Sequence, residues 1–229
     1  MPDKLQIITT SDGSHSLINT ELNETYHSTH GAIQESLHVF IKNGLDYFQQ
    51  KNKPTEIKIS EVGFGTGLNA LLTLQYSLRQ PIKIHYESLE AFPIDQQTAS
   101  RLNYAITLGF PDAEKYFLQL HQSTWDEQNI ISNSFALFKR HVKIQDIDLG
   151  SEKFDVIFFD AFAPSKQPEM WELSILKKIE QSMRAGGVFV TYCAKGQVKR
   201  DLKSVGLTVE TLPGPPGKKE MIRATKSWS

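Results

Sequence analysis

Apolar residues recur along this chain with two different periods, and the period changes from one segment to the next. Spacings of three and four residues predict helices; they occur at 32–50, 67–80, 94–108 and 168–183. Short apolar or alternating runs predict strands; they occur at 57–62, 82–89, 135–147, 154–159 and 188–192. Because strands and helices alternate, we expect an α/β fold built on a doubly wound, mostly parallel sheet.

The composition of these segments, and the residues between them, refine the expected topology. The run 154–159 is almost wholly apolar, which is typical of a central parallel strand covered on both faces. Gly186 and Gly187 are interpreted as the stop of the preceding helix. Two further strand-like runs, 207–212 and 221–225, are separated only by a Pro/Gly-rich segment that leaves no room for a helix, so they should form an antiparallel hairpin.

Length and composition fit one soluble domain. The chain has 229 residues, of which 39% are hydrophobic and 22% charged, too apolar for a disordered protein. We expect a single domain over 1–229, with residues 1–54 as an N-terminal extension packed on it. No run of about 18 apolar residues predicts a membrane span, and no signal peptide is visible. Cys193 is the single cysteine and is interpreted as a buried inert thiol, so a cytoplasmic location is expected.

Charge is distributed unevenly along the chain. The net charge is −1, yet residues 195–226 contain eight Lys or Arg side chains and three acidic ones. A basic C-terminal segment of this kind could steer a polyanion to one face, although ordinary solvated surface charges explain the same pattern.

A glycine-rich turn between strand 57–62 and helix 67–80 carries the sharpest chemical signal. Its sequence over 61–69 is EVGFGTGLN. Alternate glycines let a ligand approach the backbone, and the helix N-terminus that follows supplies free N–H groups. Gly65, Gly67 and Ala70 fit a dinucleotide turn, whereas an acidic residue before Gly-x-Gly-x-Gly is favoured by enzymes that bind S-adenosylmethionine. Glu61 would repel a pyrophosphate and attract an ammonium, which favours S-adenosylmethionine.

Acidic residues follow the other predicted strands. Glu90 is our choice to accept the ribose hydroxyls, and Glu87 is interpreted as a solvated or strand-edge charge. Asp146 is a candidate for the adenine amino group. Asp160 follows the most apolar strand, where such folds place their ligands, and Phe162 beside it could stack on a base.

The histidines give no metal site. His27 and His30 have helical spacing but no third ligand, so they are interpreted as a polar surface pair, and no metal is expected.

Together these segments resemble the methyltransferase part of the MnmC family, bifunctional enzymes that make 5-methylaminomethyl-2-thiouridine at the wobble position of tRNA. The likeness runs over about residues 13–224 and rests on segments 61–69, 90–93, 160–171, 184–187, 198–206 and 218–221, with 26–28 and 34–36 near the start. The longest run, DAFAPSKQPEMW at 160–171, is the most specific. The family more often has Gly at the position of Ala161 and Asn at that of Gln167, which are small departures.

The resemblance implies a class I methyltransferase sheet and a set of site residues. The cofactor residues would be Glu61, Gly63, Phe64, Gly65, Gly67, Asn69, Glu90 and Asp146. The substrate residues would be Tyr26, Glu35, Phe162, Pro164, Lys166, Lys218 and Lys219. Asp160 would be catalytic. Because no second nucleotide-binding motif follows, the chain is expected to resemble a stand-alone methyltransferase without the flavin oxidase domain.

The expected activity is transfer of a methyl group from S-adenosylmethionine to the aminomethyl group of a wobble uridine, with the tRNA anticodon loop as partner. Asp160 would accept a hydrogen bond from the amine and direct its lone pair. Two alternatives remain open from the residues alone: a nicotinamide-dependent oxidoreductase using the same turn, and a non-catalytic RNA-binding module.

Overall fold

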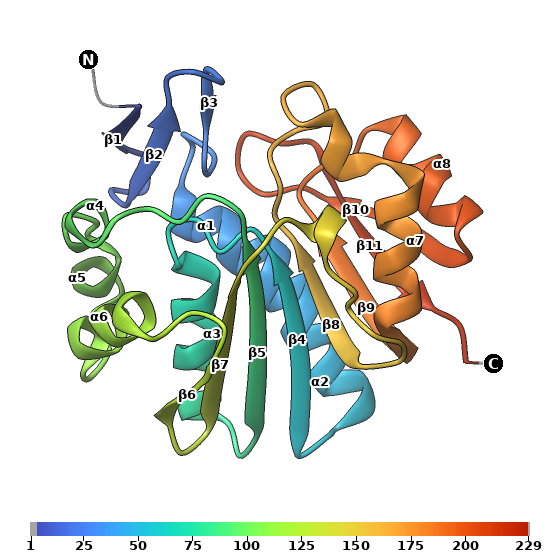
Figure 1. Ribbon diagram of the computed structural model, residues 1–229, viewed down its shortest axis with the longest axis horizontal. Helices are drawn as coiled ribbons and strands as arrows, with labels where there is room; N and C mark the ends of the chain where they lie inside the picture. Colours follow the sequence, from blue (N-terminus) through green and yellow to red (C-terminus); the bar gives the residue numbers. More distant parts are fainter. Residues whose placement is uncertain (1–3, 229) are drawn as a thin grey trace.

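The structure, a computed structural model, describes residues 4–228 and is built around one eight-stranded sheet (Figure 1). The strand order is β10-β11-β9-β8-β4-β5-β7-β6. The strands are β4 (Glu56–Val62), β5 (Lys83–Glu90), β6 (Gln128–Ser132), β7 (Phe135–His141), β8 (Phe154–Phe159), β9 (Met183–Thr191), β10 (Leu207–Pro213) and β11 (Glu220–Lys226). Strands β9, β8, β4, β5 and β7 pair in parallel, whereas β6, β10 and β11 pair antiparallel. The predicted mostly parallel sheet with an antiparallel C-terminal hairpin is confirmed.

Helices cover both faces of this sheet. One continuous helical stretch consists of α1 (Ala32–Ser36), the π-helix η1 (Leu37–Asp46) and α2 (Tyr47–Asn52). The other helices are α3 (Leu68–Arg79), α4 (Gln96–Ser100), α5 (Tyr104–Leu108), α6 (Ala113–Gln122), α7 (Leu173–Ser182) and α8 (Gly196–Ser204), with short 3₁₀ turns η2 (Ile144–Asp146) and η3 (Pro168–Trp171). In Figure 1, α7 and α8 lie on the opposite side of the sheet from α1–α3.

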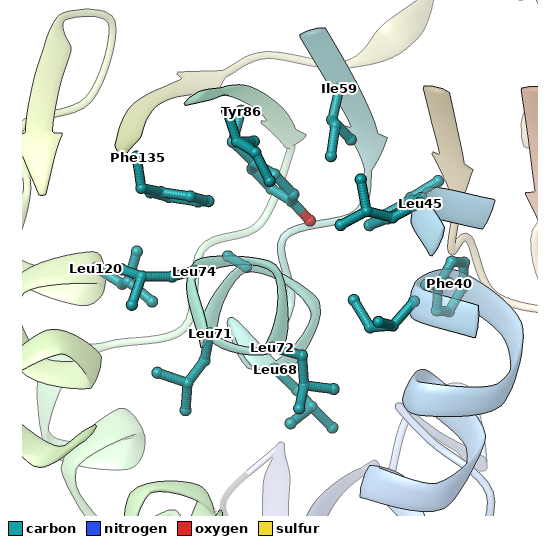
Figure 2. Close-up of a cluster of buried hydrophobic side chains, with 14 of the residues drawn as sticks. Phe40, Leu45, Ile59, Leu68, Leu71, Leu72, Leu74, Tyr86, Leu120 and Phe135 are labelled. Carbon is teal, nitrogen blue, oxygen red and sulfur yellow. The ribbon is translucent and has the colours of Figure 1, made fainter. Parts of the chain in front are cut away.

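Strand β8 shows why two cores form. Val156 and Phe158 belong to the core beneath η1, α3 and α6, while Ile157 and Phe159 belong to the core beneath α7 and α8. Successive side chains of a strand point to opposite faces, so an all-apolar strand feeds both layers. Figure 2 shows the first core, where leucines of α3 meet Tyr86 and Phe135 from the sheet.

The predicted helix over 94–108 is wrong as a single element. Two short helices, α4 and α5, replace it. Asn103 lies at the break and bonds the N-terminal segment: its Oδ1 accepts from the backbone N–H of His15 at 2.8 Å, and its Nδ2 donates to the carbonyl of Gly13 at 2.9 Å. Tertiary hydrogen bonds therefore override the apolar period here.

Other boundaries also differ from the prediction. Gly186 and Gly187 lie inside β9 and do not stop a helix, because the helix already ends at Ser182. The strand predicted within 135–147 occupies Phe135–His141 and is followed by η2. Leu37, which has the apolar spacing of the predicted helix 32–50, is 39% exposed, although Ile41 and Leu45 on the same spacing are buried.

A small N-terminal sheet completes the structure. It contains β1 (Leu5–Thr9), β2 (His15–Asn19) and β3 (Glu24–Thr25), paired antiparallel in that order. Figure 1 places it beyond one end of the large sheet, from which the chain descends into α1. Within residues 4–228, no helix has the length and apolar character needed to cross a membrane.

Candidate functional site

The glycine-rich turn follows β4 and reaches α3 through three glycines with left-handed backbone. Gly63, Gly65 and Gly67 have φ of +94°, +49° and +74°. A Cβ on Gly63 would lie 2.8 Å from the carbonyl oxygen of Asp160. The turn therefore needs glycine both for its backbone conformation and for its close approach to the end of β8.

Glu90, at the end of β5, holds this turn. Its Oε2 accepts from the backbone N–H of Gly65 at 2.9 Å, and its Oε1 accepts from that of Phe92 at 2.8 Å. A carboxylate oxygen can accept more than one hydrogen bond, so Glu90 retains acceptor capacity toward a ligand. Glu87 was expected to be a solvated or strand-edge charge, and that expectation is wrong: β5 lies between β4 and β7, and Glu87 is buried between Arg140 and Lys153, at 2.7 and 2.5 Å.

Four polar side chains gather between the turn and β8, in two hydrogen-bonded pairs. Asn69 Nδ2 donates to Asp160 Oδ2 at 2.8 Å, and Ser88 Oγ donates to Glu61 Oε2 at 2.6 Å. The remaining oxygens, Glu61 Oε1 and Asn69 Oδ1, are buried without a partner in the part of the chain described. Burial raises the pKa of Glu61 to about 8. Burial and repulsion from Glu35 raise the pKa of Asp160 to about 7.

This arrangement fits the amino-acid end of S-adenosylmethionine. Unpartnered buried acceptors beside two carboxyl groups complement a cation that carries N–H donors. Glu61 and Asn69 would hold the ammonium, and Glu90 the ribose hydroxyls. A pyrophosphate would meet the unpartnered acceptor oxygens of Glu61 and Asn69 there, where it needs donors, so the geometry disfavours a dinucleotide.

The N-terminal segment covers the turn. A Cβ on Gly65 would lie 3.1 Å from Tyr26 Cδ1, and the Tyr26 ring packs edge-on against Phe162 with centroids 5.1 Å apart. Burial, with repulsion from Glu90, raises the pKa of Tyr26 to about 12, so it stays a neutral phenol. His27 lies within 2.8 Å of Thr66 Oγ1 and is buried, so its predicted place in a surface pair is wrong.

The side of the site opposite the turn is formed by the loop after β8 and the β10–β11 connection. Buried Glu35 accepts from the backbone N–H of Ser28 at 2.9 Å and forms an ion pair with Lys218. Lys218 Nζ also lies 3.8 Å from the centroid of the Tyr192 ring. Thus Lys218 is half-buried, and its charge acts on Asp160.

The loop after β8 is fastened to the N-terminal sheet. Lys166 Nζ donates to the carbonyls of Leu22 and Asn23 at 2.8 and 3.2 Å. Half-buried Pro164 lies in the same loop. Lys166 and Pro164 therefore shape the wall of the site, and any contact between them and a substrate stays a prediction.

Three predicted residues lie less centrally. Phe64 packs its ring into the core against His121 and Trp125, so its side chain is engaged away from the turn's open face. Asp146 is exposed in η2, beyond the end of β7. Lys219 is exposed beside Lys218 on the β10–β11 connection.

The basic C-terminal segment is largely compensated. Four of its eight bases form ion pairs, and the pairs are Lys199–Glu220, Arg223–Glu210, Lys226–Glu180 and Lys218–Glu35. Neutralised side chains contribute little to a long-range field. The basic segment therefore exerts a weaker field than its eight basic residues suggest.

Sequence reasoning missed two residues behind the turn. His121 Nε2 donates to the carbonyl of Thr66 at 3.1 Å, and Lys139 Nζ donates to the carbonyl of His121 at 3.0 Å. A signal for Lys139 was present, because it falls two residues after Leu137 on the buried face of its strand.

Comparison with known proteins agrees with this geometry. Residues 100–227 match a family described as S-adenosyl-L-methionine-dependent methyltransferase. The tRNA 5-methylaminomethyl-2-thiouridine biosynthesis bifunctional protein MnmC of Leptospira borgpetersenii serovar Hardjo-bovis (strain JB197) is 33% identical over 218 residues, covering 90% of this chain and 32% of that protein. The chain thus spans about a third of the length of the curated relatives it matches.

Solved structures show the same relationship. MnmC2 from Aquifex aeolicus superposes with a TM-score of 0.77 at 25% identity, covering 97% of this chain and 71% of that one. Spermidine synthase from Thermotoga maritima has a TM-score of 0.52 at 14% identity, covers 100% of this chain and 72% of that one, and shares the fold alone. With more than half of its length matched by the family pattern, the chain belongs to the S-adenosyl-L-methionine-dependent methyltransferases, in the family of the MnmC methyltransferase part.

Proposed function

We propose that this protein transfers a methyl group from S-adenosylmethionine to the aminomethyl group of a modified wobble uridine in tRNA, converting 5-aminomethyl-2-thiouridine into 5-methylaminomethyl-2-thiouridine. The observation that carries the proposal is the position of Asp160, bonded to Asn69 of the cofactor turn and close to Glu35 and Lys218. The names of the similar MnmC proteins supply the substrate class.

The chemistry asks the protein mainly for approach geometry and a proton acceptor. S-adenosylmethionine, when bound, supplies a methyl group on a positively charged sulfur. Asp160 accepts a hydrogen bond from the acceptor amine, takes its proton and directs its lone pair. A carboxyl with a pKa of about 7 is suited to this task near neutral pH.

The surroundings of Asp160 fit an amine-bearing base. Asn69 fixes one carboxylate oxygen, which leaves the other for the acceptor. Phe162, held edge-on by Tyr26, offers a stacking surface for the uracil ring. An anticodon loop is already single-stranded, so little energy is needed to expose its wobble base. Tyr26, Glu35, Pro164, Lys166, Lys218 and Lys219 complete the proposed acceptor side.

The remaining cofactor assignments belong to the same proposal. Gly63, Phe64, Gly65 and Gly67 form the turn against which the cofactor lies, and Asp146 accepts from its adenine amino group. We also propose that residues 1–229 act as one domain in which the N-terminal 54 residues close the site.

The proposal is tested with Asp160→Asn in single-turnover methyl transfer from labelled cofactor to tRNA that carries aminomethyl-uridine. The substitution keeps the size and one acceptor oxygen, so affinity for S-adenosylmethionine should stay within a few-fold. The rate should fall by on the order of 10²–10⁴, the usual range for loss of a general base. The pH–rate profile should also change, since the amine must then lose its proton to water.

Asp155→Asn is the matched control. Asp155 lies on the same strand as Asp160 but at its amino end, where it pairs with Arg184 at 3.2 Å. This variant should lose some stability and keep the wild-type rate. Near-wild-type turnover by Asp160→Asn would remove Asp160 from the chemistry. A wild-type protein that binds cofactor but leaves this tRNA unmethylated would refute the substrate.

A further inference from the structure

Lys139 on β7 is an unusual residue, a lysine with no exposed surface. Fully buried lysines are rare unless an acid pairs with them. Its Nζ donates to the carbonyl of His121 at 3.0 Å. Within residues 4–228, no carboxylate lies within ion-pair distance of this Nζ. Burial lowers its pKa to about 8, so the side chain is still protonated at neutral pH.

Aromatic rings and a helix end stabilise the charged form of Lys139 in place of a carboxylate. Its Nζ lies 4.5 Å from the centroid of the Trp125 ring and 5.4 Å from that of Phe64, both cation–π distances. The carbonyl that it meets belongs to the last turn of α6, where the helix dipole is negative. Lys139 therefore fixes the C-terminal end of α6 against the sheet.

That end of α6 contacts the cofactor turn directly. His121 Nε2 donates to the carbonyl of Thr66 at 3.1 Å, and its ring packs edge-on against Phe64 with centroids 5.5 Å apart. A Cβ on Gly67 would lie 2.9 Å from His121 Nε2. Burial, with repulsion from Lys139, lowers the pKa of His121 to about 4, so the ring is neutral and Nε2–H is the tautomer that donates.

We propose that Lys139 and His121 are positioning residues for S-adenosylmethionine binding, in which Lys139 holds the last turn of α6 and His121 holds the Thr66 peptide of the glycine turn. Neither side chain needs to touch the ligand. The inference rests on the cofactor class and is independent of the tRNA substrate proposed above.

A purely structural role predicts a different outcome. A buried charge without a counter-ion costs free energy to bury, so replacing it by an apolar side chain of similar length could leave the melting temperature unchanged or raise it. If Lys139 serves only the core, cofactor affinity should then follow stability. If it positions the turn, affinity should fall whatever happens to the melting temperature.

The test compares the dissociation constant for S-adenosylmethionine, measured by calorimetric titration, with the melting temperature. The variants are Lys139→Met, His121→Leu, His121→Gln and the double variant Lys139→Met/His121→Leu. Ile179→Val, a core change on the opposite face of the sheet, is the control. Each of the two single apolar variants should weaken binding about tenfold, the effect of one lost hydrogen bond.

The pattern among the variants separates the two interpretations. His121→Gln keeps an N–H donor and should restore affinity to within a few-fold of the wild type. The double variant should bind no more weakly than the worse single one, because both act through the same contact. If His121→Leu does not fold, Lys139→Met and His121→Gln still decide the question. Wild-type cofactor affinity in Lys139→Met would overturn the proposal. An equal loss of cofactor affinity in Ile179→Val, at the same melting temperature as Lys139→Met, would also overturn it.

Discussion

The charge of Glu61 should depend on whether the site is filled. Its carboxyl is buried, one oxygen has no partner in the described residues, and its other neighbours are neutral or acidic: Ser88, Tyr86, Asn69 and Asp160. Burial raises its pKa to about 8, and no basic side chain contributes to that shift. At pH 7 the free protein therefore holds a proton on Glu61 much of the time.

Cofactor binding should release this proton. An arriving cation favours the carboxylate and lowers its pKa, so affinity should rise with pH through the neutral range until the cofactor's own ammonium loses its proton. Calorimetric titration at pH 7 in two buffers of different ionisation enthalpy measures the proton directly. Glu61→Gln should reduce the buffer dependence to the part that Asp160 contributes, and Asp160→Asn should show how large that part is. Equal enthalpies for the wild type in both buffers would contradict the prediction.

At the scale of elements, the strand–turn–helix unit from β4 to α3 was the most predictable part of the site. Its apolar strand, three glycines and leucine-rich helix are all local signals, and the structure places each within a residue or two of its predicted limits. Glu90 and Asp160 were predictable for the same reason, since each follows directly on a strand. The chain between residues 94 and 122 was not, because contacts of Asn103 with the N-terminal segment accompany the break between α4 and α5.

Other features depend on partners distant in the sequence and could not be predicted from local pattern. Glu and Lys usually lie at the protein surface, and only the fold brings Glu35 and Lys218 together as an ion pair. His27 is buried because the turn offers it Thr66. Helix α6 buries only Ala113, Phe117 and Leu120, too short a stripe to stand out beside its neighbours.

The turn's glycines yield a prediction at this scale. Gly65→Ala places a Cβ 3.1 Å from the Tyr26 ring at a φ of +49°, so the turn must shift and cofactor affinity should fall at least tenfold. Gly109→Ala is the control, because its φ is +58° but its nearest neighbour would be 3.8 Å away. The two variants should lose similar stability by thermal melting. Equal cofactor affinity in both would show that the turn tolerates the shift.

At the scale of the whole molecule, ion pairing reduces the field that the basic C-terminal segment can exert. Lys218 is paired with Glu35, whereas Lys219 is exposed. The two neighbouring lysines should therefore differ in their effect on tRNA binding, although both were predicted to contact the substrate.

Their contributions to tRNA binding are measurable from salt dependence. Lys219→Ala should lower the slope of log K against log salt by about one counterion, since each phosphate contact contributes ~0.7–0.9. Lys218→Ala should change the slope little and affect turnover instead. Lys177→Ala, an exposed lysine on α7, is the control. An unchanged slope in Lys219→Ala would mean that the RNA docks elsewhere.

The ion pair between Glu35 and Lys218 has a consequence for how the protein is made. Its partners are 183 positions apart, and His38 Nε2 meets the carbonyl of Pro213 at 2.8 Å across nearly the same interval. On a ribosome the early segment must wait until residues 213 and 218 have emerged before these contacts can close. Contacts of such long sequence separation form slowly and late. A nascent chain stalled just before residue 213 would thus carry the cofactor turn with an unfinished acceptor side.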